Sequence, residues 1–339
     1  PVYIAELSPA ARRGSLVSLF QVNIVAGILL AYVSNFAVGR LLAGTEVWRW
    51  KFAVAALPSL AFLVALWFIP QSPRWLVSRG RLREAAASLA RLGEADPAVT
   101  IAGLIESAHA DSGAGADARA GGATLSWQRH RRPIMLAVGL ALFNQLSGIN
   151  AILYYLGDIF RAAGFGAASA DAQSIAIGTT NLIGTLFAMS LIDRAGRRQL
   201  LLIGSVGMAL AQFAVAAILS SGLYRGWLLP LLILFIVSFA FSQGAVIWVY
   251  LSEIFPTPVR ARGQSLGSAT HWIANAIIAT GFPMVAAISQ SAPFAFFGLM
   301  MALQFGLVRR YLPETKGVVL ERMAAAIHAR TPASGSLAP

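Results

Sequence analysis

Two runs with the same pattern occur far apart in the chain: Tyr3-Ile4-Ala5-Glu6-Leu7-Ser8-Pro9 and Tyr250-Leu251-Ser252-Glu253-Ile254-Phe255-Pro256. Tyr, Glu and Pro keep the same spacing in both, and an Arg closes each run at the same distance, Arg13 in the first and Arg260 in the second. A second pair, Ile69-Pro70-Gln71-Ser72 and Leu312-Pro313-Glu314-Thr315, repeats at nearly the same offset. A long repeat built on apolar segments is typical of a transporter made of two homologous helical bundles.

The two copies differ in what precedes them. The second follows the fourth apolar segment of its own bundle (134–157, 173–192, 199–220 and 228–250), whereas the first stands at the start of the sequence, where it should mark the end of a fourth helix. We therefore expect the first helices of one bundle to be missing. What remains is predicted to be a partial N-terminal bundle followed by a complete six-helix C-terminal bundle.

The composition indicates a membrane protein. The chain is 57% hydrophobic and 12% charged, with a mean hydropathy of +0.69, which is too apolar for a soluble domain. Apolar runs of this length favour helices over barrel strands, so the predicted fold class is an all-α polytopic membrane protein. The predicted spans are 15–38, 51–69, 134–157, 173–192, 199–220, 228–250, 264–288 and 292–311.

The net charge of +12 reflects the orientation of the chain in the membrane, because basic residues collect in the loops on one side, and it does not indicate nucleic-acid binding. Most Lys and Arg residues fall in the loops that share a side with the repeated motif, which predicts a cytoplasmic location for 1–14, 70–133, 193–198, 252–263 and the C-terminal tail. Arg outnumbers Lys 24 to 2, which is typical of a GC-rich bacterial genome, and the predicted location is the bacterial inner membrane. The basic residues of the opposite loops are Arg40, Arg49, Lys51, Arg161 and Arg225.

The predicted domain organisation follows from the spans. Residues 1–73 end the N-terminal bundle with two complete helices. Residues 74–133 form a cytoplasmic linker with amphipathic helices, the first of them near 82–92, and 134–312 form the C-terminal bundle. Residues 313–339 are a cytoplasmic tail with a helical stretch at 318–329. Cysteine is absent, and no cluster with catalytic or metal-ligand spacing occurs, so we predict no enzyme activity, no metal and no cofactor.

Within the spans the polar side chains are of one kind, neutral hydrogen-bonding groups without a carboxylate. Polar groups in lipid-embedded helices are costly and tend to mark a transport path. Amides both donate and accept, and an indole offers a flat apolar face with one donor, which suits a neutral sugar or polyol. These residues are Gln21, Asn144, Gln145, Asn150, Asn181, Trp248, His271, Trp272 and Asn275.

Their spacing predicts shared helix faces in places. His271 and Asn275 are four residues apart, as are Asn150 and Tyr154. Gln145 does not stack on Asn150 in an ideal helix. The intervening Ser147-Gly148 therefore predicts a locally broken helix, a common device at transporter sites.

Four motifs in order resemble the sugar porter branch of the major facilitator superfamily. Phe143-Asn144-Gln145-Leu146-Ser147-Gly148-Ile149-Asn150, followed by Tyr154-Tyr155, is similar to that family's Gln-Gln-Leu-Ser-Gly-Ile-Asn run. The resemblance covers nearly the whole chain. The other motifs are Pro70-Gln71-Ser72-Pro73-Arg74-Trp75-Leu76, Asp193-Arg194-Ala195-Gly196-Arg197-Arg198 and Pro313-Glu314-Thr315-Lys316-Gly317.

The resemblance implies a major facilitator fold of twelve helices, with a central sugar site and alternating access. It places Tyr154 and Tyr155 near an external gate. By the same resemblance, the positions that contact or border the sugar are Gln21, Gln145, Asn150, Asn181, Trp248 and Asn275. A cytoplasmic charge network that latches the outward-facing state is implied for Glu6, Arg13, Asp193, Arg194, Arg197, Glu253 and Arg260.

Three features depart from the family pattern. Gly244-Ala245-Val246-Ile247-Trp248 lacks the proline that is common after that glycine, which is expected to stiffen the helix. Asn144 replaces the first Gln of the pair and shortens its reach by one methylene, which predicts a different hydroxyl pattern or a bridging water. His271 stands where Asn or Gln is more usual and is expected to add weak pH sensitivity.

The sequence leaves several alternatives open. Transport is predicted to proceed by proton symport or by facilitated diffusion, in a monomer that takes a small sugar and sits in the lipid bilayer. A non-transporting membrane sugar sensor and an inactive fragment of a sugar transporter are the alternatives. Any single amide or Trp, taken alone, is also explained by helix packing.

Overall fold

The computed structural model describes Tyr3 and residues 13–42, 44–94, 96–113, 124–255 and 259–314. The chain divides into two compact units. One comprises Pro1–Phe20 and Val33–Thr124, and the other comprises Gln21–Tyr32 and Leu125–Pro339. The predicted tail helix at 318–329 lies outside the described residues.

The first unit contains an apolar helix of membrane-spanning length followed by three shorter helices. Helix α3 (Val47–Leu66) has no buried residue, as expected of a helix with apolar side chains on all faces in a lipid environment. The helices after it are α4 (Pro73–Ser78), α5 (Leu82–Arg91) and α6 (Pro97–Gly113). Helix α2 (Arg13–Leu41) is shared, because its middle stretch belongs to the second unit.

The predicted amphipathic helix is confirmed as α5, and its apolar face packs on α4 and α6. Ala85 and Leu89 are buried on that face. Ser88 Oγ donates to the Gln71 carbonyl at 2.6 Å, which ties α5 to the segment before α4. At the start of α4, Ser72 Oγ accepts from the backbone N–H of Trp75, a regular N-cap.

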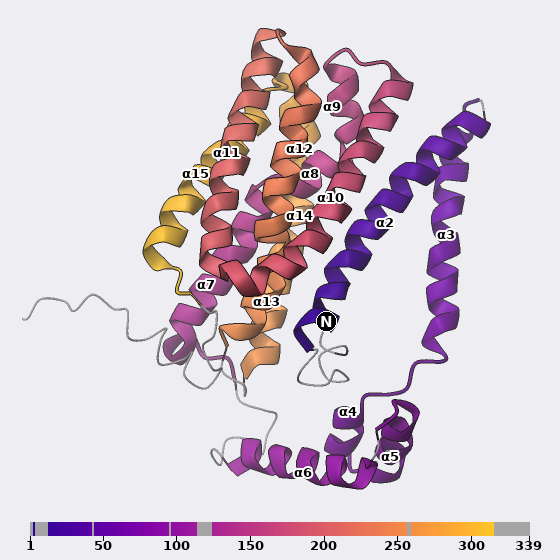
Figure 1. Ribbon diagram of the computed structural model, residues 1–339, viewed down its shortest axis with the longest axis vertical. Coiled ribbons are helices and arrows are strands. Elements are labelled where there is room, and N and C mark those ends of the chain that lie inside the picture. Colours follow the sequence, from indigo (N-terminus) through magenta and orange to yellow (C-terminus); the bar gives the residue numbers. More distant parts are fainter. Residues whose placement is uncertain are drawn as a thin grey trace, which may run out of the picture. The chain divides into compact units, whose positions relative to one another are not determined.

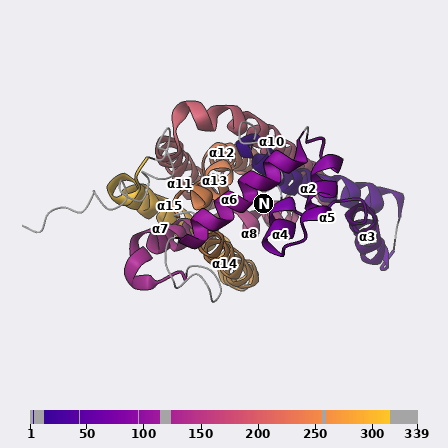
Figure 2. The same cartoon turned by 90° about the horizontal axis from the view of Figure 1, so that it is seen from below.

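The second unit is a bundle of long helices that run side by side (Figure 1) and are seen nearly end-on in Figure 2. Helix α11 packs against α12 and α15, and α14 packs against α7. Its elements are α7 (Trp127–Leu146), α8 (Ile149–Tyr154), α9 (Leu156–Ala162), α10 (Ala167–Ala195), α11 (Arg197–Ser221), η3 (Arg225–Trp227), α12 (Leu228–Phe239), η4 (Ala240–Gly244), α13 (Ala245–Glu253), α14 (Arg260–Ile288) and α15 (Ala292–Tyr311).

Among the described residues, seven helical stretches are long and apolar enough to cross a membrane. They correspond to seven of the eight predicted spans. The remaining one, 173–192, lies within the 29-residue helix α10. The fold is therefore helical throughout the described chain, as the apolar runs predict.

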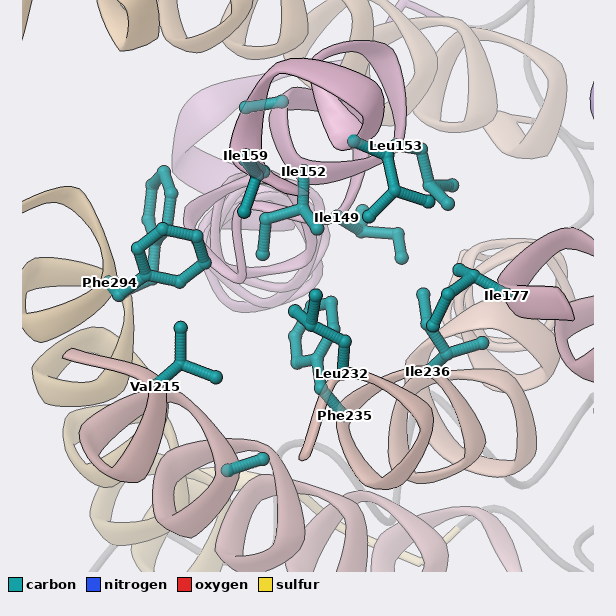
Figure 3. Close-up of a cluster of buried hydrophobic side chains, with 14 of the residues drawn as sticks. Ile149, Ile152, Leu153, Ile159, Ile177, Val215, Leu232, Phe235, Ile236 and Phe294 are labelled. Atoms are coloured by element: carbon teal, nitrogen blue, oxygen red, sulfur yellow. The ribbon is translucent and has the colours of Figure 1, made fainter. Parts of the chain in front are cut away.

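Side chains of α8 and α9 form the centre of one apolar core. Figure 3 shows Ile149, Ile152 and Ile159 facing side chains from α10, α11, α12 and α15. In lipid the hydrophobic effect between helices is weak, so the close fit of these side chains supplies the stabilisation through van der Waals contact. Packing of this kind holds the segment after α7 in place.

Small residues bring α11 close to the helix opposite. A Cβ at Gly204 would lie 2.0 Å from Ser242 Oγ, and one at Gly207 would lie 2.3 Å from Ser238 Oγ. Two glycines three residues apart therefore allow the backbones to approach, as in other small-residue helix contacts in membranes. Ser242 lies in η4, a π-helical turn, so this contact fixes α11 against an irregular part of its neighbour.

Candidate functional site

The helix that carries the predicted amides is broken between α7 and α8. Gly148 has a left-handed backbone, with φ +76°, and it separates Leu146 at the end of α7 from Ile149 at the start of α8. Ser147 Oγ donates to the Asn144 carbonyl at 2.6 Å and accepts from the Ile149 N–H at 3.3 Å. The break predicted from Ser147-Gly148 is confirmed.

A neighbouring helix completes the hydrogen bonds at the break. Gln212 on α11 donates from Nε2 to the Ser147 carbonyl at 2.6 Å, and it is almost fully buried. Backbone groups freed by a helix break in lipid persist only when other groups pair with them. Gln212 is such a partner, which the sequence analysis did not identify.

The break brings three amides together into what we call the amide cluster: Asn144, Gln145 and Asn150. Gln145 Nε2 donates to Asn144 Oδ1 at 3.1 Å, and Asn150 Nδ2 donates to Gln145 Oε1 at 3.0 Å. Asn144 and Gln145 are each 1% exposed. Both ends of the Gln145 amide are therefore engaged at the point where the helix changes direction.

His271 on α14 joins this cluster from across the unit. Gln145 Nε2 lies 3.0 Å from its Nε2 and 3.2 Å from its Nδ1, so the amide donates to whichever ring nitrogen carries no proton. The imidazole stands between two indoles, with centroids 5.1 Å from Trp248 and 5.0 Å from Trp272. Neutral hydrogen-bonding groups and flat apolar faces thus lie next to each other.

Two further pairs of predicted residues meet in the same unit. Trp248 Nε1 donates to Gln21 Oε1 at 3.1 Å. Asn275 Nδ2 donates to the Tyr154 hydroxyl at 3.3 Å, while Asn275 Oδ1 is buried with no hydrogen-bond partner among the described residues. A buried acceptor without a partner costs about 1–3 kcal/mol, so a donating group on a ligand would be favourable there.

Two predicted side chains, Asn181 and Tyr155, lie apart from the cluster. Asn181 is buried on α10 without a hydrogen bond to the amide cluster in the described part of the chain. Tyr155 stacks on Phe282, with centroids 5.4 Å apart. Tyr154 and Trp272 are both about half exposed, at 54% and 47%.

Most of the predicted latch cannot be placed. Glu6 lies outside the described residues, as do the side chains of Arg13, Asp193, Arg194 and Glu253. Of the two that remain, Arg260 Nε donates to the Phe255 carbonyl at 3.3 Å, and Arg197 is buried at the start of α11. The latch therefore stays a prediction.

Glu314 is an anchor in this region that the sequence analysis did not single out. Its carboxylate accepts from the backbone N–H of Arg197 at 2.9 Å and of Arg198 at 3.0 Å. A carboxylate at the N-terminus of α11 satisfies free N–H groups and complements the helix dipole. Gly196 leaves room for it, since a Cβ there would lie 2.8 Å from Glu314 Oε2.

A second amide pair was also missed. Gln243 Nε2 donates to Gln304 Oε1 at 2.7 Å, and the Asn144 amide lies 3.4 Å from the Gln243 carbonyl, which links this pair to the amide cluster. Gln243 lies in η4 and Gln304 on α15. The rule that identified Gln145, a neutral amide inside an apolar run, applies equally to these two residues.

The arrangement is suited to an uncharged, hydroxylated molecule. Amides offer donors and acceptors, the indoles offer flat apolar faces, and the cluster contains no carboxylate. The described residues hold no group of three or more His, Cys, Asp and Glu side chains arranged to bind a metal ion. Several neutral hydrogen bonds, each with a net contribution of about 1 kcal/mol, give a modest affinity that allows release.

Comparison with known protein families gives one consistent result. The family model described as "Sugar (and other) transporter" matches residues 1–326. The D-xylose-proton symporter of Escherichia coli K12 is 34% identical over 337 residues, which cover 96% of this chain and 67% of the relative. The glucose transporter GlcP of Staphylococcus epidermidis is 34% identical over 349 residues, which cover 98% of this chain and 73% of the relative.

Solved structures agree with the sequence comparison. The partially occluded, inward-open form of the xylose transporter XylE from Escherichia coli has a TM-score of 0.79 and 32% identity, over 94% of this chain and 68% of that one. XylE bound to 6-bromo-6-deoxy-D-glucose has a TM-score of 0.76 and 33% identity, over 96% of this chain and 69% of that one.

Proposed function

Since the chain belongs to the sugar porter family of the major facilitator superfamily, we propose that it carries a monosaccharide of the D-xylose or D-glucose class across the membrane, together with a proton. Sugar transport is the function of the family, and the chain is a multi-pass membrane protein and not an enzyme. The choice of sugar class rests on the relatives, which include D-xylose and glucose transporters.

The observation that carries the proposal is the hydrogen-bonded amide cluster at the break between α7 and α8. Asn144, Gln145 and Asn150 are held in fixed orientations, so they can exchange one partner for a sugar hydroxyl at little entropic cost. Around them we assign the sugar-contacting side chains Gln21, Tyr154, Asn181, Trp248, Trp272 and Asn275.

The gating roles follow from the same assignment. Tyr154 and Tyr155 stand where α8 gives way to α9, and we assign them to the external gate. The cytoplasmic latch is assigned to Glu6, Arg13, Asp193, Arg194, Arg197, Glu253 and Arg260. Movement of one bundle against the other around a central site would then expose the sugar alternately to each side.

Orientation and assembly are part of the proposal. The basic loops 1–14, 70–133, 193–198, 252–263 and the C-terminal tail face the cytoplasm, since positively charged loops are retained on that side. The protein acts as a monomer in the lipid bilayer of a bacterial inner membrane, because each bundle pair of this family encloses its own central site.

Proton coupling is tested by adding D-xylose to cells that express the protein, in a weakly buffered medium, while pH and uptake of labelled sugar are recorded together. We expect the medium to become alkaline in step with uptake, because each sugar enters with a proton. Uptake without a pH change would assign facilitated diffusion instead. Binding without counterflow in liposomes would assign a sensor, and would overturn the proposal of transport.

The imidazole of His271 is expected to shape the choice of sugar. In His271→Gln an amide with separate donor and acceptor replaces a ring that accepts from Gln145. One hydrogen bond to a sugar hydroxyl is worth about 1 kcal/mol, so the ratio of D-xylose to D-glucose uptake should change about fivefold.

The matched control is His130→Gln. That imidazole pairs locally with Ser126 at the start of α7, so its replacement should leave the ratio unchanged. Equal ratios in the wild-type protein and His271→Gln would remove His271 from the specificity site.

A further inference from the structure

An apolar groove lies between α7 and α15. Its volume is about 320 Å³. Its lining includes Met135, Gly139 and Phe143 of α7 with Leu307 and Tyr311 of α15. The lining is almost wholly apolar, so the groove is unsuited to a sugar, whose hydroxyls would lose their hydrogen bonds there.

The groove has a basic end and a polar inner end. Arg132, at the start of α7, lines it, and the guanidinium of Arg310, at the end of α15, lies 5.6 Å from the centroid of the Tyr311 ring. Both arginines belong to the end of the unit that the charge distribution assigns to the cytoplasm. At the other end Gln304 is 2% exposed and pairs with Gln243.

This distribution matches one class of membrane molecule. An acyl chain fills an apolar groove that opens sideways from a membrane-spanning bundle, and a phosphate accepts hydrogen bonds from guanidinium groups at the headgroup level. Anionic lipids of the cytoplasmic leaflet are attracted by clustered basic residues close to the membrane surface. Arg309, next to Arg310, and Arg131, next to Arg132, add to the positive charge at the same end.

We propose that this groove is a binding site for an anionic phospholipid, with one acyl chain between α7 and α15 and the phosphate held by Arg132 and Arg310. The site is separate from the sugar site and does not depend on the substrate. It rests only on the membrane location of the bundle, so its test requires no transport measurement.

The test is native mass spectrometry of the purified, detergent-solubilised protein with phosphatidylglycerol or with phosphatidylcholine of the same acyl chains. We expect one phosphatidylglycerol to be retained about 30-fold more strongly than phosphatidylcholine, since each of the two arginines strengthens binding several-fold. In Arg132→Gln/Arg310→Gln this preference should vanish. Arg129→Gln/Arg131→Gln removes the same amount of charge, both times from the start of α7, and should keep most of the preference for phosphatidylglycerol.

A second variant tests the groove itself. A Cβ at Gly139 meets no atom within 4 Å, so Gly139→Leu should fold and fill the groove, and should lose the bound lipid. Gly306→Leu is the matched control, because that glycine is exposed on α15 with equally open space and does not line the groove.

Four outcomes would overturn the proposal. Equal retention of both lipids would indicate a nonspecific lipid shell, and unchanged retention in Gly139→Leu would place the lipid elsewhere. If phosphatidylglycerol bound only after removal of residues 315–339, the chain's own tail would be the occupant. A dimer that Gly139→Leu converts to monomers would assign the groove to a second copy.

Discussion

Gln145→Ala is expected to lower D-xylose uptake at least about 100-fold, the largest effect of any single substitution in the proposed site. The substitution removes the amide that joins Asn144, Asn150 and His271. It leaves several buried polar groups without a partner, each at a cost of about 1–3 kcal/mol, and removes the direct contact with the sugar. Two such losses suffice for the predicted factor. The measurement is the initial rate of labelled D-xylose uptake in proteoliposomes.

The control is Gln128→Ala, which makes the same change on the same helix at an exposed position. It should transport normally. Stabilisation by the sugar distinguishes a role of Gln145 in sugar binding from a purely structural role. D-xylose should raise the melting temperature of the wild-type protein and of Gln128→Ala, but not that of Gln145→Ala. Uptake within about threefold of the wild-type rate, with an unchanged response to the sugar, would show that the amide cluster is not the binding site.

The amide cluster shows how far the sequence alone could lead. Neutral amides in apolar spans identified Asn144, Gln145 and Asn150, and Ser147-Gly148 predicted the break that brings them together. Both inferences depend only on residues close in the chain, where helix geometry is fixed by spacing. For the same reason the apolar runs predicted eight membrane-spanning segments, of which seven are confirmed, and the spacing of apolar residues predicted the helix α5.

Contacts between distant segments could not be predicted in this way. His271 reaches Gln145 because α14 packs against α7, and the helical pitch of neither segment specifies that pairing. Glu314 caps α11 by a similar long-range contact. Spacing gives the face on which a side chain lies but not the helix that the face meets.

Local irregularities mark a second limit. The predicted span 134–157 forms three helices, because the chain breaks at Gly148 and again at Tyr155, and a π turn interrupts the span 228–250 at Ala240–Gly244. A glycine signals the first break. The others arise where tertiary packing outweighs the local preference for a regular helix, and hydropathy is insensitive to such changes.

Gly148→Val is expected to destabilise the second unit strongly. Gly148 has φ +76°, a conformation that costs about 1–2 kcal/mol for a residue with a side chain and more for a β-branched one. A Cβ there would also lie 2.3 Å from Cδ2 of Phe297, a buried ring stacked on Phe282. Overpacking adds about 1–3 kcal/mol. Together these terms predict a melting temperature lower by roughly 10 °C.

The melting temperature is measured on the purified protein in detergent, beside Gly281→Val as the control. Gly281 lies inside α14 with a negative φ and no atom within 4 Å of a Cβ, so valine should be tolerated there. Adding Phe297→Ala to Gly148→Val separates the two causes, because it removes the collision and leaves the backbone strain. We expect the melting temperature of the double variant to recover part of the loss seen in Gly148→Val. A melting temperature for Gly148→Val equal to that of Gly281→Val would mean that α7 and α8 form one regular helix, and Asn150 would then be too far from Gln145 for the amide cluster to form.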